Sequence, residues 1–254
     1  MTPLIDKHQV LSDIKKAQQL LDPLRELYKK IPATTCDRQA RCCTLIPEVS
    51  YIELLHMVRA LGRLPRDVRT EIMEKTIKYF FLNAVQIDSC PFLHHNTCRI
   101  YEDRPYTCRA YGLWSAAHYE ILVKKSKKAK ESVRAAWETL GVKLPLDVVA
   151  YQPDYCNRVT ITSGNSITDA ELDLIQTEIF SLERDLEQGM RRFTQDFLSD
   201  PSFFLTSAIL GYQSCLIEKV AVVRECLSNK GSSRLKQLID GIRESIEHSD
   251  IELS

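Results

Sequence analysis

The stretch that decides the architecture of this chain is residues 98–109, which read CRIYEDRPYTCR. Two cysteines flank a run of charged, aromatic and proline residues, and neither a helical nor a strand periodicity is visible in it. Such a run is typical of a loop. Cysteines in a polar loop are poor core material, so this stretch favours metal or redox chemistry.

Two further cysteine segments precede this stretch. Residues 36–43 read CDRQARCC, and residues 90–93 read CPFL. Helices are expected at 51–61 and 65–84, and they would clamp the cysteine loops together. Thiolates on loops can turn toward one point, and they are soft ligands that select zinc, copper(I) or iron–sulfur clusters. We therefore expect metal ligands at the cysteines of these loops and at one more in a later loop: Cys36, Cys42, Cys43, Cys90, Cys98, Cys108 and Cys156.

The spacing of these cysteines leaves the identity of the metal open. A structural zinc site takes four Cys or His ligands, and a [4Fe–4S] cluster takes four cysteines. Neither the C-x-x-C pair of zinc ribbons nor the closely spaced cysteine run of ferredoxins is present. An iron–sulfur cluster, most simply [4Fe–4S], and zinc are therefore both expected cofactors. The arginines beside the cysteines can stabilise thiolates by hydrogen bonds: Arg38, Arg41, Arg99, Arg104 and Arg109.

The overall composition limits the remaining classes of function. The chain has 254 residues, with 34 Lys plus Arg and 34 Asp plus Glu, so its formal net charge is zero. An apolar fraction of 44% and a charged fraction of 27% are ordinary for a globular protein and exclude wholesale disorder. Without an excess of cations, nucleic-acid binding by bulk charge is not expected. The 8 glycines form neither a P-loop nor a dinucleotide-binding fingerprint.

The number of cysteines and the N-terminal residues help to predict the cellular compartment of the protein. Nine cysteines are an odd number, so complete pairing within one chain is impossible. Residues 1–10 lack the apolar run of a secretory signal peptide, so a cytoplasmic, reducing location is expected. The apolar stretch at 203–217 is too short and too polar for a membrane span, so no membrane partner is expected.

Apolar periodicity predicts a mainly α fold, a helical domain wrapped around a loop-rich cysteine cluster that forms the metal site. We expect an N-terminal helix (1–33), a cysteine-cluster metal-binding domain (34–160) and a C-terminal helical region packed on it (161–254). The expected helices cover residues 4–30, 51–61, 65–84, 117–140, 169–188, 201–228 and 233–247, with short strands at 148–149 and 159–162.

The three cysteine segments together resemble the YkgJ-type cysteine-cluster family, a zinc- or iron-chelating domain. The resemblance covers about residues 34–110, and its most specific part is the order I-Y-E-D-R-P-x-x-C-R within 98–109. The first motif of the family is similar to C-x-x-C-G-x-C-C, and here Gln39 and Ala40 replace its second cysteine and its glycine. The resemblance implies that the chelating residues are Cys36, Cys42, Cys43, Cys90, Cys98 and Cys108.

Three functions remain open. The first is a metal-binding protein whose cysteines chelate an iron–sulfur cluster or zinc, with a redox role. The second rests on the resemblance alone: the same domain occurs in proteins similar to bacterial flagellin lysine N-methylases, which implies an S-adenosylmethionine-dependent protein lysine N-methyltransferase. The third is a structural zinc module that mediates assembly with a protein partner. The sequence contains no hydrolase motif of the G-x-S-x-G or H-E-x-x-H type.

Three other features are expected to be structural. The basic run at 124–134 is interpreted as a solvated helix face, with an acidic partner or nucleic acid as the alternative. His94 and His95 are expected to be exposed, with zinc ligation as the alternative. Cys215 and Cys226 lie on an apolar helical pattern and are expected to serve packing alone.

Overall fold

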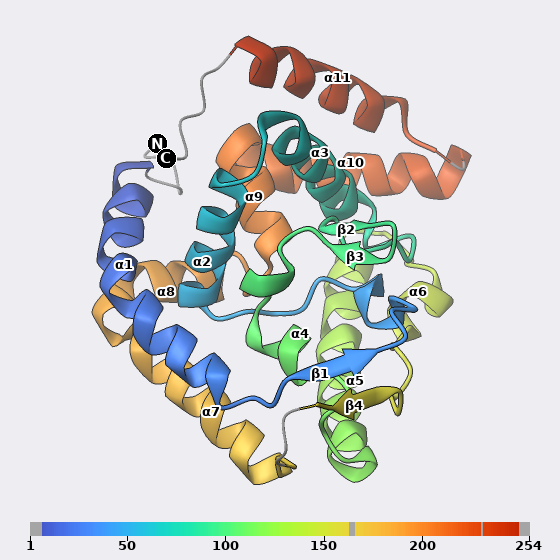
Figure 1. The fold of residues 1–254 in the computed structure, drawn as a ribbon. Helices are drawn as coiled ribbons and strands as arrows, with labels where there is room; N and C mark the ends of the chain where they lie inside the picture. The colour runs from blue at the N-terminus through green and yellow to red at the C-terminus, as the bar shows by residue number, and fades with distance from the viewer. Residues whose placement is uncertain (1–6, 163–165, 230, 249–254) are drawn as a thin grey trace.

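The computed structural model describes residues 7–162, 166–229 and 231–248. It is mainly helical, as the sequence predicts (Figure 1). The helices surround a region in which short strands and 3-10 turns lie close together. That region carries the cysteine segments.

The first half of the chain contributes three helices to the core: α1 (Lys7–Lys29), α2 (Tyr51–Gly62) and α3 (Arg66–Leu82). Pro23 lies inside α1 without splitting it. The capping box expected at the start of α2 is confirmed, because Ser50 and Glu53 each accept a backbone hydrogen bond from the other. Nearly every residue of α2 is buried, so this helix lies at the centre of the fold.

The second half is helical through most of its described part: α7 (Asp169–Leu182), α8 (Glu187–Asp196), α9 (Pro201–Leu210), α10 (Tyr212–Asn229) and α11 (Ser233–His248). Two expected helices are broken. The helix expected at 169–188 ends at Leu182, and the 3-10 turn η3 (Glu183–Leu186) leads into α8. The helix expected at 201–228 is divided at Gly211, whose φ of 82° a helix cannot contain.

The core is built from aromatic rings between α3 and α9. Phe80 stacks on Phe203 with ring centroids 5.0 Å apart and an interplanar angle of 14°. Phe197 meets Phe203 and Phe204 edge-on, each at 5.2 Å. Cys215 is completely buried in the same core, which confirms its expected packing role. The core therefore depends on apolar packing.

The cysteine segments lie on short elements: β1 (Thr34–Cys36), η1 (Arg41–Thr44), β2 (Leu93–His94), β3 (Thr97–Cys98), η2 (Tyr101–Asp103) and α4 (Tyr106–Ala110). Strand β1 pairs antiparallel with β4 (Val159–Ile161), with Cys36 opposite Val159. The strand expected at 159–162 is thus confirmed. The ribbon joins a segment near the start of the chain to one more than a hundred residues later.

Helix α5 (Ala116–Thr139) and the short helix α6 (Leu146–Ala150) complete the fold. None of the residues of α5 is buried, and its lysines at 124, 125, 127 and 128 are exposed, as a solvated face requires. The strand expected at 148–149 is wrong. Pro145 supplies a fixed φ just before α6, and Asp147 lies in its first turn, so local start signals favour a helix there.

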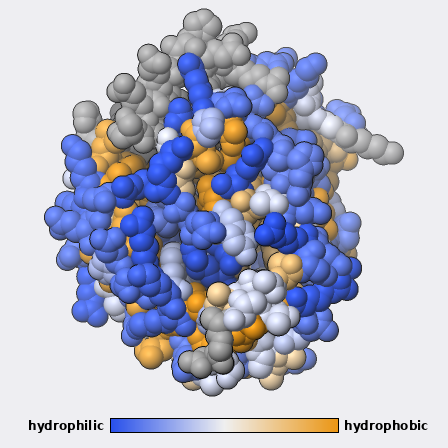
Figure 2. Space-filling model, in the orientation of Figure 1, coloured by the Kyte–Doolittle hydropathy of each residue, from blue (hydrophilic) through white to orange (hydrophobic). Residues whose placement is uncertain are grey.

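The face seen in Figure 2 is mostly hydrophilic, with hydrophobic side chains showing in small separate areas. Among the helices of the described residues, none combines the length and the apolar character that crossing a membrane requires. The stretch at 203–217 accordingly lies in α9 and α10, where its first residues are buried in the core.

Candidate metal centre

The first cysteine loop is shaped by two left-handed residues. Arg38 has a φ of 51° and Ala40 a φ of 55°, and η1 then carries Cys42 and Cys43. The amide of Cys43 donates to the carbonyl of Ala40 at 2.9 Å and closes the turn. The left-handed region favours glycine, and Ala40 stands where the resemblance places a glycine. The turn therefore keeps a glycine-like backbone although its glycine is replaced.

A tight hairpin positions the second group of cysteines. Strands β2 and β3 are joined by His95 and Asn96, whose φ values of 45° and 59° are those of a two-residue hairpin turn. Cys98 ends β3. The amide of Cys90 donates to the carbonyl of Cys43 at 2.6 Å. The backbone thus joins the first loop directly to the second.

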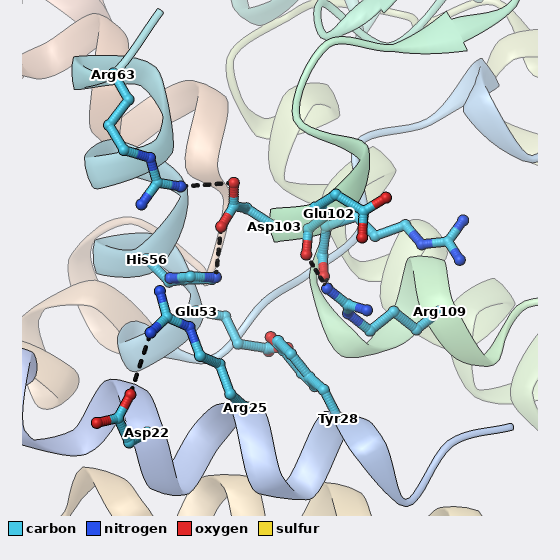
Figure 3. A network of polar contacts seen from close by, with 10 residues as sticks. Asp22, Arg25, Tyr28, Glu53, His56, Arg63, Glu102, Asp103 and Arg109 are labelled. Atoms are coloured by element: carbon cyan, nitrogen blue, oxygen red, sulfur yellow. Dashed lines mark hydrogen bonds and ion pairs between the residues drawn. The ribbon is translucent and has the colours of Figure 1, made fainter. Parts of the chain in front are cut away.

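The third loop is anchored by Asp103, which lies in the polar network of Figure 3. Its carboxylate is 3.1 Å from His56 Nε2 and 2.6 Å from the guanidinium of Arg63. Burial lowers the pKa of His56 to about 4; Asp103 opposes this change, and neighbouring arginines reinforce it. Burial therefore favours a neutral His56 at pH 7, and its contact with Asp103 holds the loop against α2.

Arg109 holds the other end of the same loop. Its guanidinium lies 4.2 Å from the centre of the Tyr28 ring on α1. It also donates to the backbone carbonyls of Arg104, at 2.8 Å, and of Glu102 (Figure 3). One cation therefore closes the loop on itself and fixes it to α1.

A buried carboxylate joins this loop to both α1 and α2. Glu53 accepts from the hydroxyl of Tyr28 at 2.8 Å and from the backbone amide of Tyr106 at 2.5 Å. Its other oxygen accepts from the amide and hydroxyl of Ser50. These bonds compensate the cost of burying a charge. Because Tyr106 begins α4 and Cys108 follows in that helix, Glu53 fixes the position of the cysteine.

Cys42 and Cys43 place their sulfur atoms 3.8 Å apart. A hydrogen bond from the Cys43 thiol is the main reason that the pKa of Cys42 is lowered to about 7; burial opposes this and Arg104 assists it. The same bond raises the pKa of Cys43, and burial and the charges of Cys42, Cys90 and Cys108 add to the rise. The pair therefore favours the thiolate on Cys42 over that on Cys43.

Three further thiols lie in the same electrostatic environment. Burial raises the pKa of Cys90 to about 12, and the charges of Cys98 and Cys42 add to this rise. Burial likewise raises the pKa of Cys98 and of Cys108, and Arg104 opposes the rise in both. The thiols of these three loops thus form one group, which we call the thiol cluster: Cys42, Cys43, Cys90, Cys98 and Cys108.

The thiol cluster reaches the surface of the protein. Cys42 and Cys108 are exposed residues, whereas Cys43, Cys90 and Cys98 are half-buried. The thiol of Cys108 is nevertheless surrounded by enough protein for burial to raise its pKa. The cluster therefore borders the surface through the residues Cys42 and Cys108, although the thiol of Cys108 is itself covered.

Two of the predicted ligands lie on or beside the β1–β4 ribbon instead. Cys36 is exposed at the end of β1, and Cys156 is half-buried in the loop before β4. Burial raises the pKa of Tyr111, and the charges of Cys42 and Cys156 are among the smaller causes of the rise. Tyr111 is therefore close enough to Cys42 and to Cys156 for the charges of both to act on it. Ligation by Cys36 and Cys156 stays a prediction.

The thiol cluster contains the kind of ligand that a zinc or iron–sulfur site uses, but its sulfur atoms are not arranged around a metal position. In the part of the chain that the structure describes, no three Cys, His, Asp or Glu side chains are arranged to hold a metal ion. Thiolate sulfur is nevertheless a ligand that zinc and iron–sulfur clusters share. The donor set fits either group, and the thiols of the cluster are the side chains that would hold it.

The two loop histidines differ in their surroundings. His94 lies 3.4 Å from Glu71 of α3 and is half-buried, whereas His95 is exposed. Their rings contact each other at a centroid distance of 4.2 Å. The expected exposure is confirmed for His95 and is wrong for His94, because the carboxylate of Glu71 draws that ring against α3.

Comparison with known proteins adds an independent observation. Residues 35–134 match the model of the CxxCxxCC family. The description of that family is “Putative zinc- or iron-chelating domain”. The match confirms the resemblance predicted from the cysteine segments, and it extends from β1 through most of α5. No curated protein and no solved structure matches the chain.

The sequence alone does not reveal the residues that anchor the cysteine loops. Glu53 is visible there only as part of a helix cap, and His56 and Tyr28 only as members of helices. The order E-D-R-P does mark Asp103 and its neighbours as specific. Their partners on α1 and α2 become visible only in the folded chain.

Proposed function

We propose that this protein binds zinc or an iron–sulfur cluster through thiolates of the thiol cluster, and that the bound metal remains accessible to a partner. The observation that supports the proposal best is the gathering of cysteines from three separate loops into one electrostatic group. Zinc bound there would supply Lewis acidity, and an iron–sulfur cluster would supply electron transfer.

The exposure of part of the thiol cluster favours a metal that takes part in Lewis-acid or redox chemistry over a purely structural zinc module. Structural zinc sites are closed and four-coordinate, and they supply the folding energy of domains that lack a sufficient core. Here Cys42 and Cys108 are exposed. The buried core is apolar, and of the cluster only Cys90 and Cys98 pack against its edge. The helical fold therefore has its own source of stability.

A reducing compartment such as the cytoplasm is part of this proposal. Every cysteine of the chain is free in the structure. Thiols as close and as exposed as those of the cluster are readily oxidised outside such a compartment. A location that keeps them reduced also keeps them available as ligands.

Metal analysis of the full chain tests the proposal. The protein is purified without oxygen and without a metal-binding tag, and iron, zinc and acid-labile sulfide are counted per chain. About four irons with sulfide and a broad visible absorption identify a [4Fe–4S] cluster. About one zinc without sulfide identifies a zinc site. A chain that contains neither, and that binds neither on reconstitution, contradicts the proposal.

Replacement of one cluster cysteine should separate metal binding from folding. We expect Cys98→Ser to lose most of the bound metal, because it removes a thiol from the cluster, while the far-ultraviolet circular dichroism of the metal-free protein stays that of the wild type. Cys226→Ser is the matched control, since Cys226 lies on α10 among helices. Equal metal content in both variants counts against the assignment of the cluster as the site.

A further inference from the structure

The hairpin between Cys90 and Cys98 carries two adjacent histidines that the proposed function does not use. His94 ends β2, and His95 opens the turn that leads to β3. Successive side chains of an extended strand point to opposite faces, which normally keeps neighbouring imidazoles apart. The left-handed backbone of His95, with a φ of 45°, breaks this alternation, and the two rings contact each other with centroids 4.2 Å apart. The turn therefore brings two imidazoles together.

The carboxylate of Glu71 on α3 orients the first of these rings. Glu71 Oε1 lies 3.4 Å from His94 Nδ1, and Lys75 Nζ holds the same oxygen at 2.6 Å. A histidine that binds a metal through one nitrogen almost always presents its other nitrogen to a carboxylate, a backbone carbonyl or water. Among the described residues no other polar contact engages either ring, so Nε2 of His94 and both nitrogens of His95 are free for a ligand.

Both rings are open to solvent and close enough to share a cation. The side chain of His94 is 33% exposed, and His95 is an exposed residue. Two imidazole nitrogens at about 2.0 Å from one ion keep their ring centroids about 4.5–5 Å apart, so the observed 4.2 Å requires only a small turn of the rings. Imidazole is a ligand that suits zinc, copper, nickel and iron. The pair therefore has the donors, the orientation and the access that a transition-metal ion needs.

The register of the hairpin separates this pair from the thiol cluster. Leu93 lies opposite Cys98 across the ribbon, and His94 lies opposite Thr97. Paired residues share a face of the ribbon and adjacent pairs alternate, so His94 and Cys98 are on opposite faces. Within the described ranges, no set of three Cys, His, Asp or Glu side chains completes a metal site here. An ion on the two rings therefore keeps its other coordination positions for water.

We infer that His94 and His95 form a metal site of their own, which takes a divalent transition-metal cation such as Zn²⁺ from solution, and that Glu71 is the residue that positions His94. The inference goes beyond the proposed function, since it holds whether or not the thiol cluster binds a metal. Two uncharged nitrogens attract a cation less strongly than four thiolates, so the bound ion exchanges readily. Such a site suits capture and release of a cation.

Zinc titration of the full chain, followed through the histidine ring nitrogens by NMR, tests this inference. The protein carries isotope-labelled histidine, and ZnCl₂ is added under reducing, oxygen-free conditions. We expect the signals of His94 and His95 to shift together, at a higher zinc concentration than saturates any tight binding by the cysteines. His94→Gln and His95→Gln should each abolish this weaker binding. Glu71→Gln should weaken it about 10–100-fold, as is usual when the partner of a metal-binding histidine is removed.

His118→Gln is the matched control for these variants. His118 also faces a carboxylate, that of Asp173 at 3.4 Å, but the ring stacked beside it is Trp114. This variant should keep the weaker zinc binding of the wild type. The far-ultraviolet circular dichroism of His95→Gln should equal that of the wild type, because His95 is exposed, so the loss of zinc binding in this variant is not a loss of folding.

The outcomes separate this inference from the proposed function. If neither ring shifts as zinc is added, or if His94→Gln and His95→Gln both keep the weaker binding, the inference fails and the proposed function stands. If the His94 ring shifts with a first zinc that Cys98→Ser also removes, His94 belongs to the thiol cluster and the separate site is wrong. Shifts of both rings in a chain whose cysteines bind no metal support the inference and count against the proposed function.

Discussion

Around Phe80 the chain packs aromatic rings against one another, whereas around Cys42 it gathers thiols among hairpins, 3-10 turns and left-handed residues. In the first region burial of apolar surface stabilises the structure and leaves little freedom. In the second region the backbone is anchored by Asp103 and Arg109, while Cys42 and Cys108 are exposed residues. The difference predicts that the stability of the fold and the chemistry of the thiol cluster draw on separate sources of free energy.

The largest expected effect comes from breaking the core. Phe81 is completely buried and meets the ring of Phe80 at 5.0 Å. Phe81→Ala should lower the free energy of unfolding by about 3–5 kcal/mol, because it removes a large side chain and leaves a cavity. Urea denaturation measures this loss. Phe180→Ala on α7 is the control; it removes a ring that is 53% exposed and should change stability by less than about 0.5 kcal/mol.

Comparing Phe81→Ala and Phe180→Ala with the separate variant Cys98→Ser tests whether the core and the thiol cluster depend on different sources of stability. The core variant should lose stability and keep its metal per folded molecule. The cysteine variant should keep the stability of the metal-free protein and lose its metal. A cysteine variant that unfolds as readily as Phe81→Ala would show that the two regions share one source of stability.

Low pH is expected to have an effect of intermediate size on the free energy of unfolding. The effect arises at His56, which joins α2 to the loop of Asp103. The pKa of His56 is about 4 in the folded protein and near the ordinary value of 6.5 in the unfolded chain. Between these values the unfolded chain binds more protons, so stability should fall as the pH falls from about 6.5 to 4, by about 2–3 kcal/mol. The charged and titratable groups that face His56 are Arg25, Tyr28, Arg63, Asp103 and Arg109.

The contribution of His56 is isolated by a variant. His56→Gln retains a donor for Asp103 and cannot titrate in this range. The difference in unfolding free energy between wild type and variant, measured in urea at several pH values, should shrink as the pH falls below 6.5. A difference that stays constant with pH means that His56 does not cause the acid sensitivity.

The smallest expected effect concerns the turn before Cys42. Ala40 has a φ of 55°, a conformation that costs about 1–2 kcal/mol for a residue with a Cβ. Glycine removes this cost but loses about 0.5–1 kcal/mol in chain entropy, so Ala40→Gly should stabilise the protein by about 0.5 kcal/mol. Ala129→Gly on the exposed face of α5 should instead destabilise by about 1 kcal/mol. A destabilised Ala40→Gly would mean that the turn is not strained.

The elements that the sequence predicts well carry local signals. Helix α2 begins with the pair Ser50 and Glu53, α7 begins with a similar box, and α9 begins with Asp200 followed by proline. Helix α8 has no such signal. An added Cβ at Gly189 would come within 2.3 Å of the Tyr51 ring, so this helix depends on close contact with α2. Contacts of that kind join distant parts of the chain and leave no periodic trace in the sequence.

The residues of the candidate site likewise fall into those that the sequence reveals and those that it does not. Its cysteines could be recognised because thiols clustered in polar loops have few structural explanations, and the family match supports that interpretation. The anchoring contacts could not be recognised. Tyr28, Glu53 and His56 are ordinary helix residues in the sequence, and their roles arise only when α1 and α2 pack beside α4. Coordination itself stays a prediction.

The hydrogen bond from the amide of Cys90 to the carbonyl of Cys43 has a consequence for how this protein can evolve. Because it involves only main-chain atoms, replacing either side chain leaves the bond available. If the thiol cluster binds a metal as proposed, a cysteine of either loop could be exchanged for a histidine while the two loops keep their register. The choice of metal would then depend on the side chains, and the backbone framework would stay the same.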